Sequence, residues 1–215
     1  LKLTPCLTVV LETSGRPRVS ITSPVGTSAG KREPSSLTPK GKFQAAEKGV
    51  FDKFIRPRLE GTFCNPIRID KILEKTNAQL PIRQDRIDTP FSRMGGANAT
   101  ATSFAALLCA ANSAGVNPEI AIHKLYNMIA KKNRLPQAFR MSLPVPMAKA
   151  ADGGVHGALD KKDRPVNPVQ EYLWIPLGYS KWTDAVEACM EATARFRELM
   201  ARQRFDMKIG AEAGI

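Results

Sequence analysis

The sequence predicts two domains, an α+β domain over residues 1–135 and a second domain over residues 140–215. Two hydrophobic patterns support this division. Near the N-terminus, β-branched residues flank a glycine-bearing turn and are followed by segments with helical periodicity, which predicts a hairpin and then helices. After residue 140 the chain changes to short continuous apolar runs, typical of buried strands, before one long amphipathic segment. A chain of 215 residues is long enough for a sizeable core and for one or two domains.

The first domain is expected to contain one hairpin and several helices. Residues 7–12 and 17–22 are the two expected strands. Asn65 supplies a capping side chain and Pro66 a first-turn proline for the second of the helices. The expected helices are 45–55, ended by Pro57; 67–75, with Ile69, Ile72 and Leu73 buried; 98–114, ended by Gly115; and 119–131, begun by Asn117-Pro118.

The second domain is expected to begin with two strands and a helix. Residues 142–148 and 171–177 are the continuous apolar runs, and each is expected to form a buried strand. Ser180 is expected to cap the helix that follows, and residues 207–215 are expected to form a further strand. The expected buried face of that helix consists of Trp182, Ala185, Val186, Cys189, Ala192, Phe196, Leu199 and Met200.

The net charge, the cysteine spacing and the lengths of the apolar runs indicate which kinds of binding partner and cellular environment to expect. A net charge of +12 suits an acidic partner surface, but the lysines and arginines are scattered and form no run of five. No nucleic-acid-binding motif is present, so we expect no specific nucleic-acid binding. The four cysteines lack the spacing of a metal site and are expected to be reduced thiols in a reducing compartment. No apolar run reaches the length that spans a bilayer, and no secretory signal is recognisable at the start.

Six short motifs follow one another along the chain. The first is the loop 24–30, with Glu33 after it. The others are Gly96-Ala97-Asn98-Ala99, Leu143-Pro144-Val145-Pro146, Gly153-Gly154-Val155-His156, Gln170-Glu171-Tyr172 and Gly210-Ala211-Glu212-Ala213-Gly214. In this order the motifs resemble the enolase family, and the resemblance covers nearly the whole chain.

The resemblance implies a fold that the hydrophobic pattern alone does not reveal. Residues 1–135 would be the α+β lid domain of an enolase-like protein, and residues 140–215 would be the first strands and helix of its α/β (TIM-like) barrel. Residues 143–148 would then be the first barrel strand, with residues 151–157 as the loop at its carboxyl end, where barrel active sites lie. The glycines of that loop would let the backbone approach a ligand closely.

The family reaction is the reversible dehydration of 2-phosphoglycerate to phosphoenolpyruvate, in which a lysine base and two magnesium ions act. By resemblance, Glu171, Glu212 and His156 are the candidate catalytic residues. Acidic groups at such positions would help the hydroxyl group leave. Gln170 and His156 are candidate substrate-binding residues. Composition alone offers plainer interpretations, in which Glu171 is a solvated strand end and His156 caps a turn.

The loop 24–30 resembles the mobile loop of the family. By resemblance, Gly26 is a candidate substrate-binding residue and Ser28 a candidate magnesium ligand. Gly26 and Gly30 would supply the hinge freedom that such a lid requires. By composition alone, Ser28 is only a loop residue.

Departures from the family pattern limit these expectations. Asp152 stands where the family has asparagine, and the loop 24–30 and the closing motif 210–214 also differ. The family's three acidic magnesium ligands and its catalytic lysine lie in later barrel strands, beyond Ile215. We therefore expect that this chain alone neither binds magnesium nor catalyses the reaction.

Two functions remain open at this point. An incomplete barrel leaves strand edges and apolar faces uncovered, so either the remaining barrel or a protein partner should cover them. The first hypothesis is an enolase of which this chain is a part. The alternative is a non-catalytic structural subunit of a large assembly, such as an axonemal or cytoskeletal complex. The expected location is the cytoplasm, with the cytoskeleton or cilium under the second hypothesis.

Overall fold

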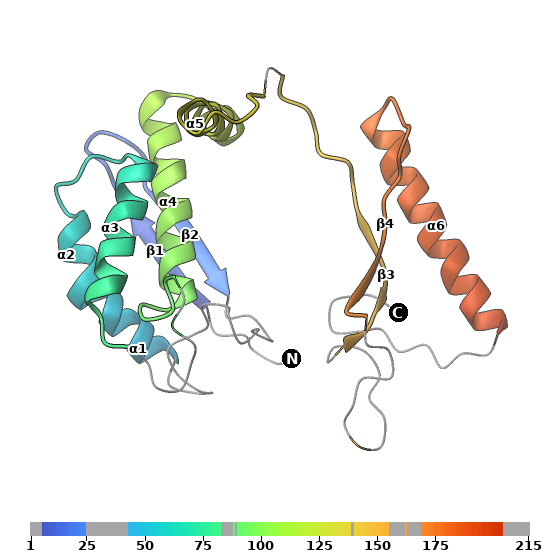
Figure 1. The fold of residues 1–215 in the computed structure, drawn as a ribbon, viewed down its shortest axis with the longest axis horizontal. Coiled ribbons are helices and arrows are strands. Elements are labelled where there is room, and N and C mark those ends of the chain that lie inside the picture. Colours follow the sequence, from blue (N-terminus) through green and yellow to red (C-terminus); the bar gives the residue numbers. More distant parts are fainter. Residues whose placement is uncertain are drawn as a thin grey trace. The chain divides into compact units, whose positions relative to one another are not determined.

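The chain forms two compact units, Leu1–Phe139 and Arg140–Ile215, which are described separately (Figure 1). The computed structural model describes residues 6–24, 43–82, 88, 90–138, 140–154, 162 and 169–203. The division falls between the two domains expected from the hydrophobic pattern. Helices with two small sheets are compatible with a partial enolase-like region, whereas the specific assignment to lid and barrel stays a prediction.

Unit 1 begins with the expected hairpin. Strands β1 (Cys6–Leu11) and β2 (Val19–Pro24) pair antiparallel along their whole length. Gly15 has φ 71° in the turn between them, a conformation that glycine adopts without strain. Val9 and Val19 are buried on one face of the hairpin, as the alternation of polar and apolar residues predicts.

The helical part of unit 1 follows the predicted capping signals, with one exception. The Asn65 side chain accepts a hydrogen bond from the Arg68 amide, and Gly115 ends its helix in the left-handed conformation. The prediction that Pro57 ends a helix is wrong: a π-helical turn precedes it, so the proline occupies a first turn that requires no N–H donor. The helices are α1 (Phe43–Val50), η1 (Phe51–Ile55), α2 (Arg56–Leu59), α3 (Pro66–Gln79), α4 (Gly96–Ala114) and α5 (Pro118–Lys132).

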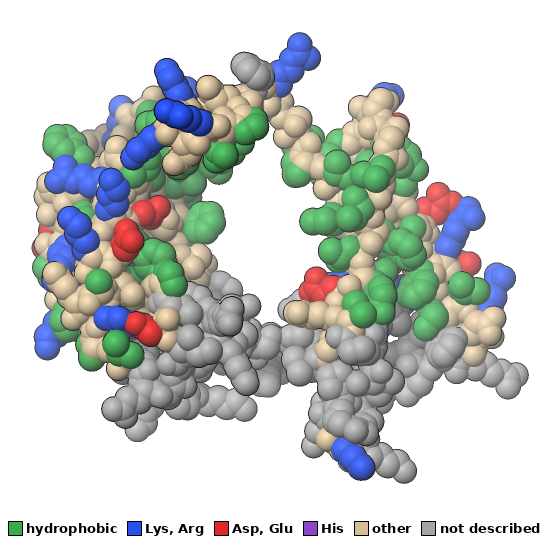
Figure 2. All heavy atoms as spheres, in the orientation of Figure 1, with side chains coloured by type: hydrophobic (Ala, Val, Ile, Leu, Met, Phe, Trp, Pro, Cys, Tyr) green, Lys and Arg blue, Asp and Glu red, His purple; other side chains and the backbone are tan. Residues whose placement is uncertain are grey.

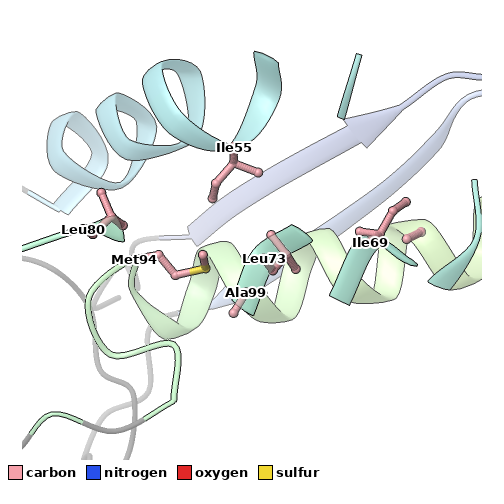
Figure 3. Packing of buried hydrophobic residues seen from close by; sticks show 7 residues of the cluster. Ile55, Ile69, Leu73, Leu80, Met94 and Ala99 are labelled. Atoms are coloured by element: carbon pink, nitrogen blue, oxygen red, sulfur yellow. The ribbon is translucent and has the colours of Figure 1, made fainter. Parts of the chain in front are cut away.

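Helix α4 is buried against two different partners. Its small side chains let the hairpin approach on one flank and η1 and α3 approach on the other (Figure 3). Ile72, which was expected to be buried, is only half-buried, whereas Ile69 and Leu73 lie in the core. The cluster at the hairpin contains Val9, Val19, Ala101, Ala105 and Cys109; the other contains Ile55, Ile69, Leu73, Leu80, Met94, Ala99 and Ala106.

A buried polar contact joins α1 to the first turn of α4. Glu47 and Asn98 are both fully buried. The Asn98 amide nitrogen donates to the Glu47 carboxylate at 2.9 Å, to the Glu47 carbonyl at 3.1 Å and to the Met94 carbonyl at 2.9 Å. Gly95 has φ 90°, and a Cβ atom at this position would lie 2.4 Å from Glu47 Oε2. The glycine therefore makes room for the buried carboxylate.

Arg93 connects the end of α3 to the segment before α4. Its guanidinium donates to both carboxylate oxygens of Asp88, at 2.9 and 2.5 Å, and to the carbonyls of Ala78 and Leu80. These carbonyls belong to the helix end, where intrahelical donors run out. The hydrogen bonds from Arg93 also lower the pKa of Asp88 below its usual range.

In its described residues, unit 2 contains a two-stranded antiparallel sheet and one helix. Strand β3 (Ala148–Asp152) pairs with β4 (Glu171–Trp174), and helix α6 (Trp182–Arg202) packs on them. Ala185 and Cys189 of α6 are buried. The rings of Trp174 and Phe196 meet edge to face, with centroids 5.8 Å apart.

The strand prediction for 142–148 is wrong except at Ala148, where β3 begins, and that for 171–177 holds only over Glu171–Trp174; proline explains both differences. Residues 142–147 pair with no other strand, since Pro144 and Pro146 have no N–H to donate to a ladder, and pairing begins at Ala148. Pro176 has the same effect after β4. Most side chains of both runs are exposed, including Leu143 and Leu177, whereas Trp174 is half-buried.

The prediction for α6 also needs correction at its ends. The N-cap residue is Lys181 rather than Ser180, and no side chain caps the helix. Trp182 and Leu199 are exposed rather than buried, although the Trp182 indole donates to the Pro144 carbonyl at 3.0 Å. The strand predicted at 207–215 lies outside the described residues.

The cysteines and helices agree with two further expectations from the sequence. Cys64, Cys109 and Cys189 are free thiols, and burial raises the pKa of the Cys64 thiol to about 12. In the described residues no single helix is long and apolar enough to cross a membrane. The bent pair α4 and α5, at 104° to each other, meets that test together by length and composition only.

Replacement of Gly95 should distinguish a steric clash from backbone strain alone. Gly95→Ala is expected to cost about 3 kcal/mol or more, because it adds a clash with the buried Glu47 carboxylate to an unfavourable φ. Gly61→Ala is the matched control, since Gly61 also has positive φ but has no atom within 4 Å of an added Cβ, and should cost about 1 kcal/mol. Urea unfolding followed by circular dichroism measures both values, and equal losses would contradict the proposed contact.

The ion pair of Asp88 should make part of the stability depend on pH. Arg93 lowers the pKa of Asp88 in the folded state. The contribution of the ionised Asp88 side chain to the free energy of unfolding is therefore fully present above its unfolded pKa, about 4. That contribution is lost as the pH falls through the folded pKa. Asp88→Asn should therefore lower the urea midpoint at neutral pH, with a difference from wild type that shrinks in acid. Asp70→Asn on α3 is the control, and a difference that persists unchanged in acid would argue against the ion pair.

Candidate functional site

The structure describes only part of the predicted site. Gln170 and Glu171 are described, as are the glycines Gly153 and Gly154 that precede the loop histidine. The other predicted site residues lie outside the described residues: Gly26, Ser28, His156 and Glu212. The candidate site is therefore built from the end of β3 and the start of β4.

Two of the sequence motifs meet at this end of the sheet. Asp152 lies directly opposite Glu171 in the antiparallel register. The Gly153 amide donates to the Gln170 carbonyl at 2.8 Å, which continues the ladder by one bond. Gly154 has φ 57°, and a Cβ atom on it would contact Gln170 at 3.6 Å. The glycine pair and the Gln-Glu pair, separated by the 15 residues 155–169, thus form one local structure.

Lys149 lies between the two acidic side chains of this site. Its ammonium is 3.1 Å from Asp152 Oδ1 and 3.0 Å from Glu171 Oε1. The Asp152 side chain is only 2% exposed and that of Lys149 18%, whereas that of Glu171 is 36% exposed. Sequence reasoning missed Lys149; the available signal was a lone charge in a small apolar run, three residues before Asp152.

The Lys149 ammonium can fix the positions of the Asp152 and Glu171 carboxylates, but the three side chains offer few ligands to a metal ion. The ammonium already satisfies one oxygen of each carboxylate. In the ranges that the structure describes, no group of three or more histidine, cysteine or acidic side chains is placed to hold a metal. Magnesium prefers several oxygen ligands in octahedral geometry, so these residues do not fit a magnesium site.

A separate pocket in unit 1 contains none of the predicted site residues. It has a volume of about 280 Å³ and lies between α3 and α4. Its lining is mainly apolar, with Asp70 as its charged residue. One residue of the sequence motifs, Ala99, lines this pocket.

Comparison with known proteins places the chain near one group of enzymes. No protein-family model matches it. Enolase from Anaplasma phagocytophilum is 26% identical over an alignment that covers 95% of this chain and 46% of that protein. Enolase from Aeropyrum pernix is 26% identical over 89% of this chain and 40% of that protein. Enolase from Pyrobaculum aerophilum is 31% identical over 72% of this chain and 30% of that protein.

These alignments agree with the order of the sequence motifs and extend over most of the chain. The chain spans less than half the length of the curated relatives it matches. It is therefore a diverged enolase-like protein, related to enolases along most of its own length and over less than half of theirs.

Proposed function

We propose that this chain carries the N-terminal part of an enolase-like fold, with the lid domain in unit 1 and the first barrel strands in unit 2. One observation carries the proposal. The hydrogen bond from Gly153 to Gln170 brings the Gly-Gly turn beside Glu171, so that two family motifs form a single strand-end structure. Barrel enzymes build their active sites at such strand ends. Alignment with enolases supports the same assignment.

The proposed chemistry is that of the family, dehydration of 2-phosphoglycerate, but not by this chain alone. Glu171 is held in ion-pair contact by Lys149 at 3.0 Å. The described residues do not supply a magnesium site, and in the family the remaining ligands and the lysine base come from later barrel strands. Turnover would therefore require further polypeptide to complete the site.

The exposed apolar side chains of unit 2 favour a covering structure. They gather on the part of the molecule formed by β3, β4 and their flanking segments (Figure 2). Exposed apolar groups of this number usually mark an interface. They are Met141, Leu143, Val145, Met147, Tyr172, Leu173, Ile175, Leu177 and Tyr179.

This surface also supports the second candidate function. A structural subunit of a large assembly, axonemal or cytoskeletal, would bury the same apolar residues against a neighbouring protein. The basic charge of +12 suits an acidic neighbour. Peptide mapping past Ile215 on natively purified protein separates the two cases. Downstream barrel peptides support an enolase, and a chain of this mass that stays within a complex supports a subunit.

The purified chain of 215 residues should not turn over 2-phosphoglycerate in the presence of magnesium. The reason is that Glu171 is ion-paired and the described residues form no magnesium site. Formation of phosphoenolpyruvate, followed by its ultraviolet absorbance, is the measurement, with an authentic enolase as the positive control. Magnesium-dependent turnover that Glu171→Gln abolishes would refute this prediction.

Charged substitutions in the apolar surface should reduce its dye binding and its self-association without unfolding unit 2. The double variant Leu143→Glu, Leu177→Glu is expected to bind less of a hydrophobic fluorescent dye and to self-associate less, because both side chains are exposed. Met190→Glu, at an exposed position of α6, is the matched control and should change neither property as much. Dye binding and light scattering that are equal in the two variants would count against a specific apolar surface.

A further inference from the structure

The register of β3 and β4 creates an electrostatic conflict. Asp152 and Glu171 are directly opposite each other, and like charges in facing positions of a sheet destabilise the pairing. Asp152 is also almost completely buried. A buried carboxylate requires a partner of opposite charge or several hydrogen bonds. The strand end is therefore stable only if a positive charge lies close to both groups.

A bulge in β3 lets one lysine meet this requirement. In a regular strand, residues three apart point to opposite faces, so Lys149 could not reach the carboxylate of Asp152 on its own strand. The pairing shifts between Lys149 and Ala151, where Ala150 is the extra residue. Such a bulge resets the alternation of side chains. As a result, the Lys149 ammonium lies about midway between the two carboxylates, at 3.1 and 3.0 Å.

We infer that Lys149 is the positioning residue of this site, a built-in counter-ion that holds Glu171 against β3 and keeps the two strand ends paired. Its charge, rather than its aliphatic stem, is the property that matters. No cation from solution is needed to keep the Gly153–Gln170 hydrogen bond in place, because the Lys149 ammonium lies between the two carboxylates. The inference rests on the ion-pair geometry and is independent of the proposed reaction.

Hydrogen exchange of the Gly153 amide tests this role, since its bond to Gln170 spans the two strand ends. In the full chain, Lys149→Met should speed exchange by about tenfold or more, because the ammonium that lies between the two facing carboxylates is then lost. Lys149→Arg should keep exchange within about threefold of wild type, since it retains the charge. Lys149→Met combined with Asp152→Asn should recover most of the protection, because this change removes both the buried charge and the repulsion.

Several results would overturn the inference. Equal acceleration of Gly153 exchange in the single and double variants would mean that Lys149 acts through packing. No acceleration in Lys149→Met would mean that Lys149 does not keep the two strand ends paired. If Lys149→Met does not fold, the double variant decides: a folded double variant supports the counter-ion role, and an unfolded one refutes it. Exchange in the wild type should be the same with magnesium or with a chelator, and slowing by magnesium would also refute the inference. None of these readouts depends on turnover of 2-phosphoglycerate.

Discussion

Burial of α4 on two flanks is the constraint on which unit 1 depends. Alanine and cysteine side chains on that helix let the hairpin and α3 approach closely at the same time. A larger side chain at Ala101 or Ala105, both fully buried, would push one partner away. The Asn98 amide then fixes α1 against the same helix through Glu47. Four elements are thus placed by one helix.

Unit 2 depends on different physics. A two-stranded sheet is marginal by itself, and α6 covers it mainly through Ala185, Cys189 and the Trp174–Phe196 contact. Much apolar surface stays exposed, and a buried carboxylate is stabilised by an ion pair rather than by packing. This exposed surface is the basis of the proposal that an additional structure covers the unit. This agrees with alignment to less than half of an enolase.

The relationship to enolases and the details of the site bear on function in opposite ways. The order of motifs and the strand-end geometry connect the chain to an enzyme family. Lys149, however, occupies the space between the carboxylates of Asp152 and Glu171. Glu171 lies at the start of β4 and is in ion-pair contact with Lys149. Homology and local chemistry therefore have to be judged separately.

The sequence by itself determined the elements whose signals are local. Asn65 and Gly115 mark helix ends, the hairpin follows from its alternation, and the motif order led to the enolase family. These features reflect backbone preferences within a few residues. Only the tertiary structure decided which distant groups meet. The Asn98–Glu47 contact joins residues 51 apart and the Lys149–Glu171 contact joins residues 22 apart. Neither could be predicted, because one depends on how helices pack and the other on a bulge that changes register.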